Sequence, residues 1–189
     1  MTKNLLTGLG HILYYKNPKA LEALEAPLPK DKINSLFSEL GFFDEDLYAL
    51  YSWKNGCAFG KLVNPVFIFS TTILKLEEVV KYKKRYPDDE LNFEDLLLIF
   101  ANEEEGLLFN SSKGNDYGKI HLYSVPLLSI DKPVPYYDSL QSMLQTTITM
   151  YKENALELDV KTSFLDVDIE KSIEIYDRYN PKCRYYSIE

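Results

Sequence analysis

The sequence contains few of the residues from which metal and redox sites are built. Its 189 residues include two cysteines, two histidines and one tryptophan. Cys57 and Cys183 form neither a Cys-x-x-Cys motif nor a disulfide framework, which indicates reduced thiols, although a long-range pairing of the two stays open. The isolated histidines and cysteines provide no close pair of ligands for a transition metal. We therefore expect no metal ion, and no motif indicates another cofactor.

Long apolar runs are missing as well. No stretch approaches the roughly 18 uninterrupted apolar residues that span a bilayer. Gly8 and Gly10 interrupt the apolar start of the chain, and no small-residue cleavage site follows them. The sequence therefore predicts neither a membrane-spanning segment nor a secretory signal. Together with the reduced thiols, this indicates a cytoplasmic protein.

Positive charge is scarce relative to negative charge. The chain carries 21 Lys and Arg against 29 Asp and Glu, which gives a net charge of −8. This balance argues against binding to nucleic acid or to an anionic membrane, because Lys and Arg supply most of the affinity for both. It permits a basic protein partner. Apolar and aromatic residues are plentiful, at 46% and 14%, and they suffice for the core of one domain with extensions.

Common motifs of nucleophilic catalysis are also lacking. There is no Gly-x-Ser-x-Gly turn. Cys57 has only His11 or His121 to act as its base, and neither lies at a diagnostic spacing. We interpret Cys57 as a small buried side chain, and His121 as a structural histidine within a predicted strand. The many carboxylates leave open a hydrolase that uses two dispersed acids.

Helical patterns begin the chain. Residues 5–25 are predicted to be mainly helical, and Asn17 is expected to cap a helix whose first residue is Pro18. After an extended connector, a second amphipathic helix is predicted to end at Gly41. Its apolar face consists of Ile33, Leu36, Phe37 and Leu40.

Another helix is predicted immediately afterwards. Asp44 is a suitable N-cap, because its carboxylate can accept hydrogen bonds from the first free N–H groups. Phe43 before the cap and Tyr48 after it have the spacing of a hydrophobic staple. The pair Asn55-Gly56 is expected to form the turn that follows the helix, since both residues tolerate positive φ.

The middle of the chain changes to short aliphatic and aromatic runs. Residues 66–69 predict one strand, and the runs at 96–101, 106–109 and 120–123 predict an antiparallel meander. Between them, residues 76–86 have the periodicity of a helix. Its dense basic residues are interpreted as a solvated helix face.

Two further helices are predicted toward the C-terminus. Asp138 and Gln141 have the spacing of a capping box at the start of the first. In the second, Ile169, Ile173 and Tyr176 are expected to face inward. The order of helices, strands and helices predicts an α+β fold: a single domain whose mixed or antiparallel central sheet is flanked by helices.

Several segments, in this order, resemble the SUKH superfamily of SMI1/KNR4-like proteins. Leu28-Pro29 leads into an amphipathic helix, and the segment DLYALYSWKNG at 46–56 resembles the family's N-terminal signature. The segment GKIHLY at 118–123 is similar to its glycine-led strand, and YDSLQSML at 137–144 to its closing helix. The chain departs from the family at 104–107, where Glu-Glu-Gly-Leu replaces a frequent Gly-Asp.

This resemblance implies an α+β domain without catalytic activity. It also divides the chain into three parts. Residues 1–26 would be an N-terminal helical segment packed on the domain, 27–151 the SUKH-like domain, and 152–189 a C-terminal helical extension.

The resemblance further implies a function in protein binding. Bacterial members resemble immunity proteins, which neutralise a cognate toxin of a polymorphic or contact-dependent toxin system by direct binding. The partner would then be a protein toxin, for example a basic nuclease domain, and the protein a monomer or weak homodimer. The alternative is a regulatory adaptor, similar to the fungal members in cell-wall signalling, and the hydrolase with dispersed carboxylates is a third hypothesis.

Aromatic and acidic residues are the expected contacts for such a partner. Tyr and Trp are enriched at binding hot spots, and carboxylates suit a basic surface. Asn55 and Gly56 are expected to shape a turn rather than to bind. The candidate partner-binding residues are Trp53, Glu103, Glu104, Glu105, Tyr117 and Tyr123.

Overall fold

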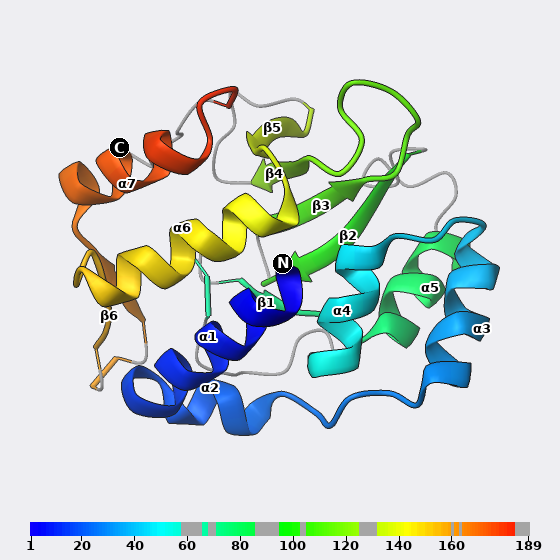
Figure 1. The fold of residues 1–189 in the computed structure, drawn as a ribbon, viewed down its shortest axis with the longest axis horizontal. Coiled ribbons are helices and arrows are strands. Elements are labelled where there is room, and N and C mark those ends of the chain that lie inside the picture. The colour runs from blue at the N-terminus through cyan, green and yellow to red at the C-terminus, as the bar shows by residue number, and fades with distance from the viewer. Residues whose placement is uncertain are drawn as a thin grey trace.

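A five-stranded antiparallel sheet lies at the centre of the computed structural model, which describes residues 1–57, 66–67, 71–85, 95–102, 105–124, 132–159, 161–162 and 164–183 (Figure 1). Neighbours in the sheet follow the order of the chain, as in a meander. The strands are β1 (Thr72–Ile73), β2 (Leu96–Ala101), β3 (Glu105–Asn110), β4 (Ile120–Ser124) and β5 (Val134–Tyr137). The predicted α+β class and the antiparallel pairing of the three central strands are confirmed.

Helices from both ends of the chain cover the sheet. Near the N-terminus lie α1 (Thr2–Lys16), α2 (Pro18–Ala23), α3 (Lys30–Leu40) and α4 (Glu45–Trp53), and α5 (Leu76–Arg85) follows β1. The C-terminal part contains α6 (Leu140–Lys152), a hairpin of β6 (Leu156–Leu158) and β7 (Leu165–Val167), and α7 (Ile169–Tyr179). In Figure 1, α1 and α6 run side by side, α7 lies beyond α6, and α3, α4 and α5 gather at the opposite end.

The core is continuous, and α6 is its central helix. Nine of the 13 residues of α6 are buried, because α1 packs on one of its sides and α7 on another. Leu9 of α1 and Tyr176 of α7 belong to the same buried cluster as Leu107 of β3. The three predicted segments therefore contribute to one hydrophobic core.

Local capping rules correctly placed several helix ends. The Asn17 side chain accepts a hydrogen bond from the N–H of Ala20, with Pro18 as the first helical residue. Gly41 ends α3 in the left-handed conformation. Asp44 caps α4, and the rings of Phe43 and Tyr48 lie 5.6 Å apart, as expected for a staple.

The predicted capping box of α6 is wrong by one residue. Ser139 is the N-cap, and it exchanges hydrogen bonds with Ser142. Asp138 instead accepts a hydrogen bond from the thiol of Cys183, and the amide of Gln141 donates to Asp46 on α4. Long-range partners thus engage the two side chains that the local pattern assigned to the cap.

The predicted inward face of α7 is confirmed for Tyr176 but wrong for Ile169 and Ile173. Ile169 and Ile173 are exposed, by 49% and 36%, whereas Ser172, Ile175 and Tyr176 are buried. The chain supplies isoleucines on both sides of this helix, and the small Ser172 allows the close approach that decides which side turns inward. Its hydroxyl lies 3.4 Å from the carbonyl oxygen of Ala155.

Two further predictions need correction. Residues 152–189 are not uniformly helical, because the β6–β7 hairpin precedes α7. Of the predicted strand at 66–69, Val66 and Phe67 lie in no strand, and their N–H groups both donate to the carbonyl oxygen of Thr71. Residues 68–69, like Tyr86 at the end of the predicted helix, lie outside the described residues.

Candidate functional site

The predicted partner-binding residues lie in three separate places. Trp53 is the last residue of α4, and its half-buried indole lies against α1, where a Cβ on Gly10 would come within 3.4 Å of it. Glu105 begins β3, and Tyr123 lies opposite Gly106 on β4. Tyr117 lies in the loop between these strands. Glu103 and Glu104 lie outside the described residues.

The β3–β4 hairpin keeps Tyr117 apart from the other candidates. Glu105 and Tyr123 lie at one end of the hairpin, whereas Tyr117 lies beyond its other end. At about 3.4 Å per residue, β3 alone separates these ends by roughly 17 Å. The N–H of Glu105 donates to Oδ1 of Asn102 at 2.6 Å, and Nδ2 of Asn102 donates to Oε2 of Glu105 at 3.0 Å. The carboxylate of Glu105 is therefore directed toward Asn102. Tyr117, by contrast, is exposed and packs against other aromatic side chains.

Five other aromatic rings connect Tyr117 to the core. The ring of Tyr117 packs edge-on against Phe109 of β3, with centroids 5.9 Å apart, and Phe109 stacks with Phe42 at 6.2 Å. Phe42 also contacts Phe37, with ring centroids 5.9 Å apart, and Phe37 contacts Phe43 at 5.6 Å. We name this group the aromatic cluster; it consists of Phe37, Phe42, Phe43, Tyr48, Phe109 and Tyr117.

The aromatic cluster reaches the surface at two residues. Phe37 and Phe109 are almost completely buried, whereas Phe43 is 55% and Tyr117 41% exposed. The exposed rings are therefore held by packed neighbours and lose little side-chain entropy when a partner covers them. Tyr48 supports Phe43 from the first turn of α4.

A hydrogen bond fixes Tyr117 beside a carboxylate. The phenol donates to Oδ2 of Asp44 at 2.8 Å, while Oδ1 of Asp44 accepts the N–H groups of Asp46 and Leu47, both at 2.9 Å. Both oxygens of the N-cap are thus engaged. Burial, followed by the hydrogen bond to Asp44, raises the pKa of Tyr117 to about 12. The phenol therefore stays protonated and remains a donor at neutral pH.

Further carboxylates surround this surface. Asp116 is exposed next to Tyr117 and forms an ion pair with Lys119 at 2.7 Å, a hydrogen-bonded contact that lowers the pKa of Asp116. Glu45 is exposed in the first turn of α4. Exposed rings beside carboxylates can bind Lys or Arg, because a cation gains from the ring face and from the negative charge together.

A groove lies between α3 and α5. It encloses about 480 Å³ and is lined by Lys32, Leu36, Glu39, Glu77, Val80, Lys81 and Lys84. Lys84 binds Glu39 at 2.6 Å, and this hydrogen-bonded contact lowers the pKa of Glu39. A lowered pKa keeps Glu39 ionised, which is the reverse of what a carboxylic acid needs in order to donate a proton.

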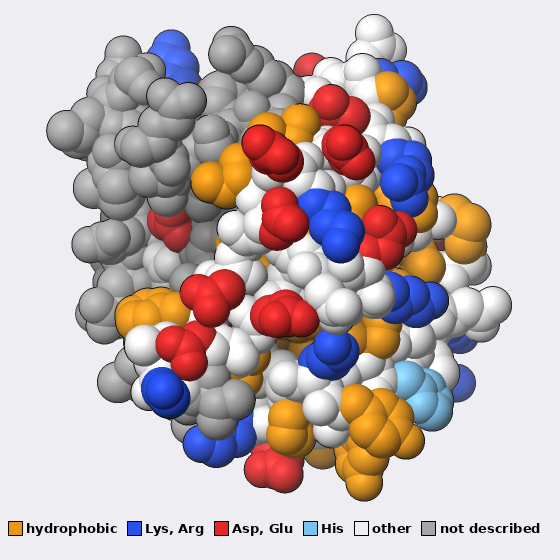
Figure 2. Space-filling view, turned by 90° about the vertical axis from the view of Figure 1, so that its left-hand side faces the viewer, with side chains coloured by type: hydrophobic (Ala, Val, Ile, Leu, Met, Phe, Trp, Pro, Cys, Tyr) orange, Lys and Arg blue, Asp and Glu red, His pale blue; other side chains and the backbone are white. Residues whose placement is uncertain are grey.

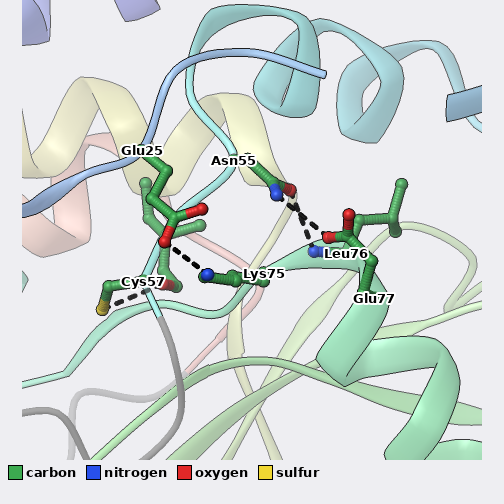
Figure 3. Close-up of polar contacts among 7 residues, drawn as sticks. Glu25, Asn55, Cys57, Lys75, Leu76 and Glu77 are labelled. Atoms are coloured by element: carbon green, nitrogen blue, oxygen red, sulfur yellow. Dashed lines mark hydrogen bonds and ion pairs between the residues drawn. The ribbon is translucent and has the colours of Figure 1, made fainter. Parts of the chain in front are cut away.

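The turn after α4 joins four elements (Figure 3). Asn55 lies buried between α4 and α5, and the backbone of Gly56 adopts φ +73°. Lys75, just before α5, forms an ion pair with Glu25, which lies just after α2. Cys57 is buried, with its Sγ 3.6 Å from the carbonyl oxygen of Ile73. These contacts hold the backbone in place and leave no exposed functional group at the turn itself.

Several functional candidates were not predicted from the sequence. Phe42 and Phe43 carry a local signal, because two adjacent aromatic residues before a cap exceed what a staple requires. The contact between Tyr117 and Asp44 carries none, since 73 positions separate the two residues. Only the fold brings the β3–β4 loop onto the start of α4.

Among the described residues, no group of three His, Cys, Asp or Glu side chains could hold a metal ion. Cys57 and Cys183 are both free thiols. In the same part of the chain, no helix has both the length and the apolar character needed to cross a membrane. No protein-family model matches the chain, and no curated protein matches its sequence.

Proposed function

We propose that this protein is a non-enzymatic binding module that neutralises a basic protein, as the cytoplasmic immunity protein of a toxin system. The observation that carries the proposal is the surface of the aromatic cluster, where Tyr117 and Phe43 are exposed beside Asp44. Direct binding through this surface would block the partner without any chemical step.

The construction of the surface supports a binding function. Hot spots are commonly aromatic side chains held in one conformation by packed neighbours. Phe43 and Tyr117 meet this description, because each contacts a buried ring, Phe37 and Phe109 respectively. The exposed parts of both rings are therefore available to a partner.

Charge supports a basic partner. Asp44, Glu45 and Asp116 surround the exposed rings, and the chain as a whole carries a charge of −8. Such a field accelerates the approach of a basic protein and repels acidic ones. A toxin nuclease, which needs cations to hold phosphates, is a partner of this kind. The motif order over residues 27–151 that resembles SUKH proteins points the same way.

The test uses the toxin domain encoded by a gene adjacent to that of this protein. Binding of the purified domain is measured at several salt concentrations for wild type, Phe43→Ala and Tyr117→Ala. We expect each variant to weaken binding by about tenfold or more, because truncating a hot-spot residue costs about 2 kcal/mol or more. Tyr15→Ala is the matched control: Tyr15 is an exposed aromatic residue near the far end of α1, and we expect it to leave the affinity unchanged.

Two results would contradict different parts of the proposal. If wild type neither binds the toxin domain nor protects cells that express it, the immunity function is wrong. If wild type binds and protects, but Phe43→Ala and Tyr117→Ala bind equally well, the function stands and the aromatic cluster is not the contact. Urea unfolding of each variant checks that the substitution has not unfolded the protein.

A further inference from the structure

The outward face of α7 combines exposed isoleucines with acidic residues that form no ion pair within the described part of the chain. Because Ser172, Ile175 and Tyr176 are buried, the opposite side of the helix faces solvent. Helical spacing of 100° per residue places Glu170, Glu174 and Asp177 together at the centre of that side. We name these three residues the acidic strip. Ile169 and Ile173 border the strip on one flank and are exposed.

The cations of α7 do not neutralise the acidic strip. Lys171 donates to the carbonyl oxygen of Glu153, and Arg178 binds the carboxylate of Glu153 at 3.3 Å. Both cations therefore extend along the other flank of the helix, toward the end of α6. Within the described residues, no ion pair involves a member of the acidic strip.

This arrangement is unfavourable for the isolated protein. Glu170 and Glu174 lie one turn apart, as do Glu174 and Asp177, and like charges at these spacings repel. The neighbouring hairpin repeats the pattern, since Glu157 of β6 pairs directly opposite Asp166 of β7 and both are exposed. Like charges opposite each other also destabilise a strand pair.

Figure 2 views the molecule from this side. Acidic side chains lie across the middle of the face, with basic side chains between them and apolar side chains around them (Figure 2). Phe164, the residue before β7, is another exposed apolar residue of this region. A face that combines repelling carboxylates with exposed apolar groups is suited to a surface that supplies cations and an apolar stripe together.

We propose that the outward face of α7 is a docking site for a Lys- and Arg-rich amphipathic helix of a partner protein. The apolar stripe of that helix would cover Ile169 and Ile173, and its cations would pair with the acidic strip. Charge complementarity favours this occupant over nucleic acid or an anionic membrane, which would be repelled. It also disfavours a second copy of this chain, because two acidic strips would face each other.

This site is distinct from the aromatic cluster and does not rest on the proposed function. In Figure 1, α7 lies at one end of the molecule, and α3 and α4, which carry part of the aromatic cluster, lie at the other. Two surfaces that both suit basic partners would allow one partner to contact both, or two partners to bind at once.

The test uses the full chain and a labelled 14-residue Leu/Lys peptide that forms one apolar and one basic helical face. Binding is measured by fluorescence anisotropy at 150 mM salt. A peptide of the same composition, scrambled so that no face forms, separates amphipathic recognition from charge attraction. We expect the scrambled peptide to bind at least about tenfold more weakly.

Matched variants locate the site. Glu170→Gln/Glu174→Gln and Ile169→Ser/Ile173→Ser are each expected to weaken binding by about tenfold or more. Glu22→Gln/Asp31→Asn removes the same charge from exposed positions on α2 and α3 and should change binding less than about twofold. Urea unfolding of the Glu170/Glu174 variant checks that it is folded.

Three results would contradict this docking site. Equal weakening by the strip variant and the control variant would reduce the effect to total charge and overturn the docking site. Absence of binding at 150 mM salt would overturn it as well. A wild-type dimer in sedimentation that is lost in Ile169→Ser/Ile173→Ser would assign the face to a second copy instead.

Discussion

Asn55 and Glu77 are joined by a partly buried hydrogen bond that links the end of α4 to the start of α5. Nδ2 of Asn55 donates to Oε2 of Glu77 at 2.9 Å, and Oδ1 of Asn55 accepts the N–H of Leu76 at 3.1 Å (Figure 3). A residue 21 positions earlier in the chain therefore caps the first turn of α5. A buried amide satisfied on both sides costs little, whereas the loss of either partner leaves the other uncompensated.

Asn55→Asp is expected to make stability depend on pH. The new carboxylate still accepts the N–H of Leu76, but it places a second negative charge beside Glu77. We expect a loss of about 2 kcal/mol at pH 7, because two close carboxylates cannot both ionise without cost. The pair takes up a proton in the folded state, so the loss should shrink as pH falls from 7 to 4. Urea unfolding across this range measures it.

Asn55→Ala is the control for that variant. It removes both hydrogen bonds and adds no charge, so its loss should stay nearly constant over the same pH range. Parallel pH profiles for the Asp and Ala variants would contradict the proposed proximity of the two carboxylates.

Gly56→Ala and Gly41→Ala should separate backbone strain from steric overlap. Both glycines have positive φ, +73° and +78°, which costs an alanine roughly 1 to 2 kcal/mol. A Cβ on Gly56 would also lie 2.5 Å from the carbonyl oxygen of Ile73, whereas a Cβ on Gly41 would meet nothing within 4 Å. We expect Gly56→Ala to lose clearly more stability in urea unfolding. Equal losses would show that the backbone at 56 relaxes away from Ile73.

His121 should reduce stability below neutral pH. Burial lowers the pKa of His121 below its ordinary value of 6.5, against smaller opposing effects of the Pro133 carbonyl and Asp116. The unfolded chain therefore takes up a proton before the folded one does, and stability falls as pH drops below about 6.5, by at most ~1.4 kcal/mol per pH unit. In His121→Gln this contribution should vanish between pH 7 and 5. His11→Gln, on an exposed position of α1, should retain the wild-type slope.

Asp46 and Gln141 should be energetically coupled. The amide of Gln141 donates to both carboxylate oxygens of Asp46, at 3.1 and 3.0 Å, and so ties α6 to α4. A double-mutant cycle of Asp46→Ala and Gln141→Ala should give a coupling of about 1 to 2 kcal/mol, as for a hydrogen bond to a charged group. The cycle cancels what Asp46 alone contributes to the helix dipole of α4. Additive losses, within about 0.3 kcal/mol, would contradict the link.

Features governed by neighbouring residues could be predicted, and those governed by distant ones could not. Asn17 and Asp44 were assigned as caps because a cap needs only its own first turn. Asp138 and Gln141 fitted the same rule equally well, yet Cys183 and Asp46 bind them instead. Ser139 and Ser142, the pair one position further along the chain, form the capping box.

The same distinction applies to α7 and to the candidate site. Ile169, Ile173 and Ile175 give this helix two apolar faces, so periodicity alone could not choose between them. The contact between Tyr117 and Asp44 depends on how the meander meets α4. Tyr117 could be selected as an aromatic residue in a turn, but its partner could not.

Trp53 is an intrinsic fluorescence probe of the contact between α1 and α4. It is the only tryptophan of the chain, and its indole lies between α4 and Gly10 of α1. Tryptophan emission, excited apart from that of the tyrosines, therefore reports whether α1 is packed against α4. A partner that binds α7 should leave this emission unchanged, whereas any process that lifts α1 away would shift it to longer wavelength before the sheet unfolds.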